Sequence, residues 1–559
     1  MKTGNRWAWP AWAIVAVFGV VLATGIFVPV YADEAAGVLM RGMFLANDWR
    51  LNTLMPQCGP GFLQSVQWLH LPGALVSDLI MHAGTPLGVR VRGLAIGFAW
   101  LLATWMVFRA LIRSDVLRIW LFAGFVAVLG VGVLPLTLVM MRGEQMMLFL
   151  LSVLLVLPLV LRRDGAAGHQ GTTAGLAAAF CLVTSLFFYT HPKAVFFIPL
   201  VLLSGVATFG PRSRYWTAIV TTVVLGAAWQ TLKFAAQVSS CPGAPQMSAI
   251  LAGNTVSLGG AWAAPGAFVQ TLIANVQAAP EAMLRHIVFA DNYQSAWLAS
   301  VPGLEQWQPV ASINACIGYV VRGTYWAALL FPPVLIVVQA IRRAPAGAVW
   351  WMAAFWLALV GHAALFKTWN FYAASLLLPI ALWCLVFAIA TLLDRWRAAD
   401  TARTGHVVAA VLSPVLVLFL ASAAVLVLRA LPPTIESSRS AGFGLPRQGL
   451  SIPALDYAKQ RPGIRAFARQ CNIQGDGARH LVVDNLTYFA FDDLREPLQS
   501  DYLYEQGFGV DLKGDALPAL LKRLGAPGII AQCTMFPTVF APRMRREGNL
   551  CCVDLSNGQ

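Results

Sequence analysis

The sequence has few charged residues, and acidic ones are the scarcest. Of its 559 residues, 11% are charged and 58% are hydrophobic, whereas an ordinary soluble domain is about 25% charged. A soluble globule of this length needs a more polar surface. A disordered or fibrous chain is excluded as well, because the sequence contains 20 Trp and 31 Phe and no short repeat. The composition is that of a polytopic membrane protein.

Several motifs are also missing. There is no G-x-x-x-x-G-K-[ST] loop, which argues against ATP-driven transport. There is no G-x-S-x-G elbow and no H-E-x-x-H helix. Nine cysteines are too few for a disulfide scaffold, and none has the spacing or the His partners of a structural zinc site.

Eleven apolar stretches are long enough to be membrane spans, since about 20 helical residues cross roughly 30 Å of hydrocarbon. They lie at 11–30, 91–112, 119–140, 146–161, 172–190, 194–209, 216–236, 323–341, 348–366, 371–393 and 406–429. The predicted fold is an all-α transmembrane domain over residues 1–429, followed by a small C-terminal domain over 430–559.

The basic residues of the loops orient these spans. If the N-terminus is cytoplasmic, the six inside segments contain 14 Lys or Arg and four acids, and each has at least two basic residues. This is the positive-inside pattern. It accounts for most of the net charge of +14, so the charge does not indicate a nucleic-acid partner. We expect a multi-pass protein of a bacterial inner membrane, with its C-terminal domain in the periplasm.

The first span has a second interpretation. Val30-Tyr31-Ala32 is similar to a small-residue cleavage site, after which Asp33 would become the N-terminus. A cleaved signal usually has an apolar core of about 7–15 residues, and this run is longer. We therefore expect an uncleaved anchor.

Three long segments lie outside the membrane in this topology: loops 31–90 and 237–322, and the tail 430–559. Within the tail, residues 453–471 have a helical pattern, and residues 480–485, 528–533 and 549–555 have the pattern of short buried strands. The tail is thus predicted to be an α/β domain.

Seven of the cysteines fall in these outer segments. Cys241 and Cys316 bracket the second loop and are a candidate pair. Cys471 has three candidate partners in the tail, Cys533, Cys551 and Cys552, because sequence does not fix connectivity.

An acidic pair, Asp33 and Glu34, directly follows the first span. A carboxylate at the outer interface is placed to take a proton from a hydroxyl presented at the bilayer. The alternative is that the two acids only solvate the end of the helix.

Other polar turns are expected at the same face. The third span ends at MMRGEQMM, which contains Arg142, a candidate phosphate ligand, and Glu144, a candidate ligand for a substrate hydroxyl or a metal. The fifth and sixth spans meet at YTHPKAVF, which contains His191 and Lys193. A Lys at a helix start is disfavoured by the dipole, so it is more plausibly there to meet an anion.

Lys367, between the ninth and tenth spans, adds a further cation. Each motif also has a purely structural interpretation, as an interfacial turn or as a snorkelling lysine. The prediction that all these turns lie on the same side of the membrane is stronger evidence for a site than any single motif.

The YADEAAG segment with its long first loop, the MRGEQ turn and the HPKA turn resemble the polytopic GT-C glycosyltransferases, which use lipid-linked sugars. The large insert and the soluble tail are similar to those of protein O-mannosyltransferases and aminoarabinose transferases. The resemblance covers the architecture of the whole chain, although its motifs are short.

The resemblance implies a polyprenyl-phosphate sugar as donor and a glycan, lipid or protein as acceptor. It implies that Asp33, with Glu34 beside it, is the catalytic base. Arg142, Lys193, Lys367 and His191 are then the candidates for stabilising the leaving phosphate. Some members of the family use a divalent metal, but no cofactor is predicted because no ligand cluster is visible.

Two other classes of function remain open. A transporter or flippase of a lipid-linked glycan would have ionisable residues at mid-membrane and often two related halves. Only Lys233 and His362 are candidates within spans, and no related halves are visible. A sensor or scaffold whose tail binds a partner is the third possibility.

Overall fold

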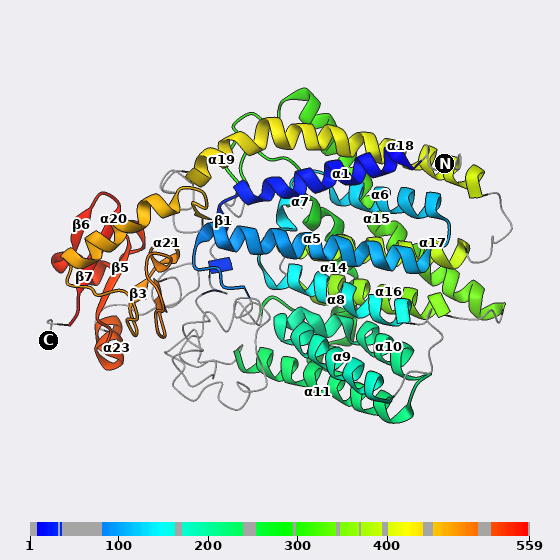
Figure 1. Ribbon diagram of the computed structural model, residues 1–559, viewed down its shortest axis with the longest axis horizontal. Coiled ribbons are helices and arrows are strands. Elements are labelled where there is room, and N and C mark those ends of the chain that lie inside the picture. Colours follow the sequence, from blue (N-terminus) through cyan, green and yellow to red (C-terminus); the bar gives the residue numbers. More distant parts are fainter. Residues whose placement is uncertain are drawn as a thin grey trace.

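The computed structural model describes most of the chain. The described residues are 8–31, 34–35, 38, 81–161, 170–238, 253–293, 298–342, 347–367, 371–393, 401–439, 451–500 and 516–556. A helical bundle occupies most of the structure, and a small sheet domain lies at the end of the bundle where α1 finishes and α5 begins (Figure 1).

The bundle is built from helices of 4 to 34 residues. They are α1 (Trp9–Ala23), η2 (Thr24–Phe27), α5 (Pro86–Leu111), α6 (Asp115–Leu129), α7 (Leu134–Thr137), α8 (Gly143–Leu161), α9 (Gln170–Thr190), η4 (Pro192–Phe197), α10 (Ile198–Phe209), α11 (Arg214–Val238), α13 (Gly260–Ala263), α14 (Pro265–Leu284), α15 (Gln308–Ile341), α16 (Gly347–Leu365), α17 (Phe371–Leu393), α18 (Thr401–Val425), η5 (Leu426–Ala430) and α19 (Leu431–Arg439).

The helix starts follow local sequence signals. Thr85 precedes Pro86, and its hydroxyl accepts a hydrogen bond from the Gly88 N–H at 3.1 Å. Ser114 caps α6 in the same way. Both caps satisfy N–H groups that have no partner within the helix, and proline at the first position has no N–H to satisfy.

Every predicted span contains helix, but the count of eleven membrane spans is not confirmed. Among the described residues, eight helices are long and apolar enough to cross a membrane. The shortfall comes from α6, α8 and α11, which do not meet that standard. The first span packs into the bundle: Phe18 of α1 is buried, and its ring lies 6.3 Å from that of Phe419 in α18.

The third predicted span, 119–140, is broken rather than continuous. Helix α6 ends at Leu129, and Gly132 follows in the left-handed region with φ of 59°. The Gly132 N–H donates to Ser422 Oγ at 2.6 Å, and the Val133 N–H donates to the Ile287 carbonyl at 2.9 Å. The loop at Ile287, within the segment 237–322, thus occupies the break and supplies a hydrogen-bond partner that a continuous helix would have supplied itself.

The C-terminal domain contains the predicted α/β elements. Its main sheet has the order β4-β3-β5-β7-β6, parallel from β4 to β5 and antiparallel from β5 to β6. Its elements are β2 (Ser451–Ile452), α20 (Tyr457–Gln470), β3 (Val482–Val483), α21 (Asn485–Tyr488), β4 (Leu498–Gln499), α23 (Ala516–Leu524), β5 (Gly528–Gln532), η6 (Cys533–Met535), η7 (Thr538–Arg543), β6 (Arg545–Glu547) and β7 (Leu550–Asp554). The predicted helix and the three predicted strands correspond to α20, β3, β5 and β7.

Two disulfides brace this sheet. Cys552 bonds to Cys471 at the end of α20, which is one of the three expected alternatives, and Cys551 bonds to Cys533. The expected closure of the second outer loop is wrong, because the Cys316 thiol is free and exposed. Its predicted partner, Cys241, lies outside the described residues.

The sheet domain contacts the bundle at the segment that follows α1. Strand β1 (Val30–Tyr31) pairs antiparallel with β2, with Val30 opposite Ile452. The Tyr488 hydroxyl of α21 donates to the Val38 carbonyl at 3.1 Å. The domain therefore holds the chain on both sides of residues 33 and 34.

The break after α6 generates a prediction about stability. In Gly132→Ala a Cβ would lie 1.8 Å from the Ile287 carbonyl oxygen, and the left-handed backbone alone costs about 1–2 kcal/mol for alanine. We expect a markedly lower unfolding temperature in detergent. Gly226→Ala is the control, because nothing lies within 4 Å of a Cβ there. Equal unfolding temperatures for the two variants would contradict the described packing.

Candidate functional site

The Glu34 carboxylate is completely enclosed by donors. Its Oε1 accepts from Arg90 Nη1 at 2.7 Å and from the Met141 N–H at 2.6 Å. Its Oε2 accepts from Arg90 Nη2 at 2.6 Å and from the Tyr31 N–H at 2.9 Å. Both side chains of the ion pair are fully buried. A buried charge is tolerated when it is paired and fully hydrogen-bonded in this way.

Arg90, in the second turn of α5, uses its remaining donors on the end of α1. Its Nε donates to the Val28 carbonyl at 2.8 Å, and Nη2 also donates to the Pro29 carbonyl. The guanidinium therefore joins three parts of the chain: α5, the residues after η2, and Glu34. Sequence reasoning missed Arg90, which is 56 residues from Glu34 and directly precedes the predicted second span.

The other member of the acidic pair, Asp33, lies outside the described residues. The described residues that flank it are held in place, Tyr31 by the pairing of β1 and Glu34 by Arg90.

A tight turn follows the broken third span. The Arg142 N–H donates to the Met140 carbonyl at 2.8 Å, while the Met141 N–H is taken by Glu34. Gly143 then packs against the turn before η4: a Cβ on Gly143 would lie 3.1 Å from both His191 Cδ2 and the Thr190 carbonyl oxygen. Glycine at this position allows the two turns to approach closely.

The Glu144 carboxylate, in the first turn of α8, gathers three of the predicted residues. Lys193 Nζ lies 2.8 Å from Oε1, His191 Nε2 lies 3.6 Å from the same oxygen, and Arg142 Nε lies 3.6 Å from Oε2. Glu144 and Lys193 are buried, whereas the side chains of Arg142 and His191 are 13% and 27% exposed. Arg142 and His191 thus form the accessible edge of this cluster. The helix dipole also favours a carboxylate at the start of α8.

Aromatic rings form the inner wall of the cluster. Lys193 Nζ lies 4.3 Å from the centre of the Phe366 ring, a cation–π distance. The His362 ring packs against both Phe366 and Phe196, with ring centres 5.3 and 5.4 Å away. His362, which the sequence suggested only as a residue within a span, is therefore a neighbour of this cluster in the last turn of α16.

His191 has a defined hydrogen-bonding role. It caps η4 by accepting the Lys193 N–H at Nδ1, at 3.1 Å. Burial, aided by the positive charges of Lys193 and Arg142 and opposed by Glu144, lowers the pKa of His191 to about 4. His191 is consequently neutral at pH 7, with its proton on Nε2, the nitrogen that faces Glu144.

The remaining predicted cation, Lys367, is not part of the cluster. Its backbone N–H donates to the Asn254 carbonyl at 2.9 Å, and its side chain is exposed. Lys233, the other ionisable residue suggested within a span, is exposed on α11.

The described residues contain no group of three or more His, Cys, Asp or Glu that is arranged to hold a metal ion. In the cluster around Glu144, the carboxylate oxygens face cations instead. These residues fit an anion better than a metal.

No protein-family model and no curated protein sequence matches this chain. Two solved structures of the oligosaccharyltransferase AglB from Archaeoglobus fulgidus are similar to it. One is in complex with an inhibitory peptide and a dolichol-phosphate; it is 12% identical, with a TM-score of 0.40, and the match covers 93% of this chain and 69% of that one. The other is a complex with Zn and sulfate, with 11% identity, a TM-score of 0.40 and coverage of 93% and 68%.

The Glu34–Arg90 pair generates a second stability prediction. Arg90→Met leaves the Glu34 charge buried without its partner, which costs about 3–5 kcal/mol. Adding Glu34→Gln removes that charge and should recover part of the loss. Lys459→Met is the control: the side chains of Lys459 and its partner Asp456 are 79% and 32% exposed, and such pairs contribute about 0–1 kcal/mol. Unfolding temperatures in one detergent provide the comparison, and similar losses at Arg90 and Lys459 would refute the structural role of the Glu34–Arg90 pair.

The lowered pKa of His191 predicts an acid-sensitive stability. Because the folded-state pKa is about 4 and the ordinary value is near 6.5, the unfolded chain binds a proton first as pH falls. Stability due to this group is therefore present above pH ~6.5 and declines as pH falls toward 4. Between pH 7 and 5 we expect a loss of about 2 kcal/mol. His191→Asn keeps a capping side chain but should lack this loss of stability. Parallel profiles of stability against pH for the wild type and His191→Asn would disprove the assignment of the loss to His191.

Proposed function

We propose that the chain is a glycosyltransferase of the GT-C type. It transfers a sugar from a polyprenyl-phosphate carrier to an acceptor hydroxyl at the outer face of the membrane. The observation that carries this proposal is the turn from Met141 to Glu144. One end of the turn is hydrogen-bonded to Glu34, next to Asp33, and the other end gathers the cations around Glu144. A candidate base and an anion-binding edge are thus tied to the same short segment.

In the proposed reaction, Asp33 is the general base. Its carboxylate takes the proton of the acceptor hydroxyl while the hydroxyl oxygen bonds to the anomeric carbon of the donor sugar. The bond between that carbon and the phosphate oxygen breaks, and its electron pair leaves with the lipid phosphate. A direct displacement of this kind inverts the anomeric centre. An aspartate of ordinary pKa is already ionised at pH 7, so it needs no special activation.

Stabilisation of the leaving phosphate is assigned to the accessible edge of the Glu144 cluster. Two cations, Arg142 and Lys193, surround one carboxylate, while His191 is neutral. The cluster therefore has a net charge of about +1. Arg142 is the main ligand in this proposal, because its guanidinium is partly exposed and matches phosphate geometry. The His191 Nε2–H is available as a further donor.

Glu34, predicted from the sequence as part of the catalytic pair, is given a positioning role. Its carboxylate already accepts four hydrogen bonds, so none of its oxygens is free to accept a substrate proton. Glu144 and Lys193 also act through position, since each is buried against the other. Lys367 is left without a role in the transfer.

The C-terminal domain is proposed to lie in the periplasm of a bacterium, with the bundle in the inner membrane. Its two disulfides are typical of an oxidising compartment. That side of the membrane offers no nucleotide sugars, which favours a donor delivered on a lipid. The acceptor is proposed to be a glycan, lipid or protein.

Transport of a lipid-linked glycan is a weaker explanation of the described residues. A transporter requires ionisable groups near mid-membrane. Here Lys233 is exposed on the surface of α11, and His362 lies in the last turn of α16, beside the cluster at the helix ends. The buried charges at these helix ends suit a reaction at one face.

Replacement of the proposed base tests the assignment. Asp33→Asn should fold and unfold like the wild type but transfer sugar about 10²–10⁴-fold more slowly, the usual contribution of general base catalysis. The measurement is transfer from a synthetic polyprenyl-phosphate sugar by purified protein. Asp115→Asn removes an exposed acid at the start of α6 and should retain full activity. A wild-type rate of sugar transfer in Asp33→Asn would rule out Asp33 as the general base.

A further inference from the structure

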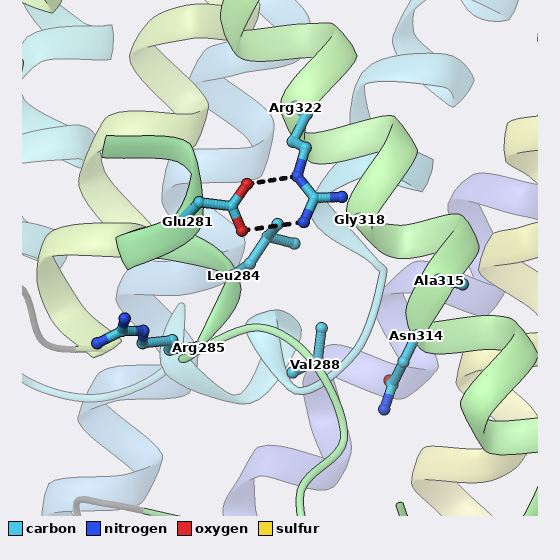
Figure 2. Close-up of a pocket in the computed structure, with 8 residues that line it drawn as sticks. All are labelled: Glu281, Leu284, Arg285, Val288, Asn314, Ala315, Gly318 and Arg322. Carbon is cyan, nitrogen blue, oxygen red and sulfur yellow. Dashed lines mark hydrogen bonds and ion pairs between the residues drawn. The ribbon is translucent and has the colours of Figure 1, made fainter. Parts of the chain in front are cut away.

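A separate cavity of about 400 Å³ opens between α14 and the first half of α15 (Figure 2). Arg285 and Glu281 line it from the α14 side, and Arg322 and Asn314 line it from the α15 side. It shares no residue with the sites of Glu34 and Glu144.

An ion pair crosses one end of this cavity. Arg322 Nε and Nη2 lie 2.5 and 2.9 Å from the two carboxylate oxygens of Glu281, as Figure 2 shows. Both side chains are about half exposed. Gly318, one turn before Arg322, leaves room for the guanidinium: a Cβ there would lie 3.0 Å from Arg322 Nη1. Because Gly318 has no side chain, the Arg322 side chain can extend across the cavity.

Arg285 supplies a second cation one turn after Glu281. It is exposed, and within the described part of the chain its guanidinium has no hydrogen-bonding or ion-pair partner. Its charge reaches Glu281: the hydrogen bond from Arg322 is the main cause that lowers the pKa of Glu281, and the charges of Arg322 and Arg285 add to it. Two arginines and one glutamate therefore line the cavity, a net charge of about +1, and the exposed Arg285 side chain points away from Arg322 (Figure 2).

The wall of the cavity is fixed before any ligand arrives. Asn314 Oδ1 accepts the Phe289 N–H at 3.0 Å, and Asn314 Nδ2 donates to the Phe289 carbonyl at 2.8 Å. These bonds hold the loop after α14 against α15. Leu284 and Val288 provide an apolar lining next to the charges.

The surroundings of the cavity are apolar and exposed. Large hydrophobic side chains are exposed at Tyr319, on α15 beside Arg322, and at Ile273, about two turns before Glu281 on α14. Helix α15 is itself long and apolar enough to span a membrane, and the sequence places the start of its hydrocarbon segment at residue 323. Trp and Tyr are enriched at this depth. Arg322 is therefore placed where lipid headgroups meet the chain.

We infer that this cavity binds the phosphodiester of an anionic phospholipid headgroup. Arg322 holds a phosphate oxygen with Nη1, which does not contact Glu281, and Arg285 holds another after its exposed side chain turns toward the cavity. Guanidinium groups form strong charge-assisted hydrogen bonds with phosphate. The neighbouring apolar side chains contact the acyl chains. A soluble phosphate would leave those exposed apolar groups uncovered, which is why a lipid is the chosen source. The inference does not depend on the proposed transferase activity.

The test is a titration of the full-length protein in detergent with dioctanoyl phosphatidylglycerol, read out by native mass spectrometry. Parallel titrations use dioctanoyl phosphatidylcholine and inorganic phosphate. The wild type should bind phosphatidylglycerol in preference to both. Arg285→Gln should weaken that binding about tenfold or more, because it removes a charged donor. Arg285 has no described partner to lose, so this variant should fold normally.

Two further variants make the result specific. Glu281→Gln removes the carboxylate that competes for Arg322, so phosphatidylglycerol should bind several-fold more tightly. Arg523→Gln removes an exposed charge from α23 of the sheet domain and should change nothing. Equal affinities in all four proteins, or an equal loss in Arg523→Gln, would overturn the site. Saturation by inorganic phosphate without a preference for the lipid would overturn its assignment to a phospholipid.

Discussion

The buried carboxylate of Glu34 is the constraint around which the end of the bundle next to the sheet domain is organised. Four donors converge on it from three separate parts of the chain: Tyr31, Arg90 and Met141. The cost of removing the ion pair from water is offset only if all these donors are in place together. The end of α1, the start of α5 and the turn before α8 therefore have one arrangement that satisfies the charge, and any displacement of one segment is opposed by the other two.

The second buried carboxylate, Glu144, connects this network to the partly exposed side chains of Arg142 and His191. It lies three residues after Met141, so its position follows from the bond that Glu34 makes to the backbone there. Around it, one contact is buried and short, with Lys193 at 2.8 Å, and the contacts with Arg142 and His191 are longer and nearer the surface. Lys193 makes the short, buried contact with Glu144, whereas Arg142 makes a longer one at the edge of the cluster, where its side chain is 13% exposed.

Much of the cluster could be predicted from the sequence, because loop charges and span count place the MRGEQ and HPKA turns on the same face. The structure brings together Arg142, Glu144, His191 and Lys193. The sequence could not separate the roles of Asp33 and Glu34, because adjacent carboxylates have the same local pattern. What distinguishes Glu34 is its partner Arg90, far along the chain, and only tertiary packing makes that contact visible.

The fold shows the same limit. Periodicity and hydropathy locate the helices, but the third span was expected to be continuous, and its break depends on Gly132 receiving the loop at Ile287 and the hydroxyl of Ser422. Each of these partners is more than a hundred residues away in the sequence. Local composition around residue 132 contains nothing that encodes them. Predictions from sequence are therefore strongest where a single helix or strand decides the outcome.

The sheet domain restrains from outside the bundle the same segment that Glu34 restrains from inside it. Strand β2 pairs with Val30 and Tyr31, and Tyr488 bonds to Val38, so residues 30–38 are held at both ends by the domain. The domain is itself braced, since Cys471 and Cys533 are covalently joined to adjacent positions of β7. A rigid body attached at two points limits the movement of a short segment more than a single contact does. The described residues that flank Asp33 in the sequence are thus held jointly by a buried ion pair in the bundle and by a disulfide-braced sheet beside it.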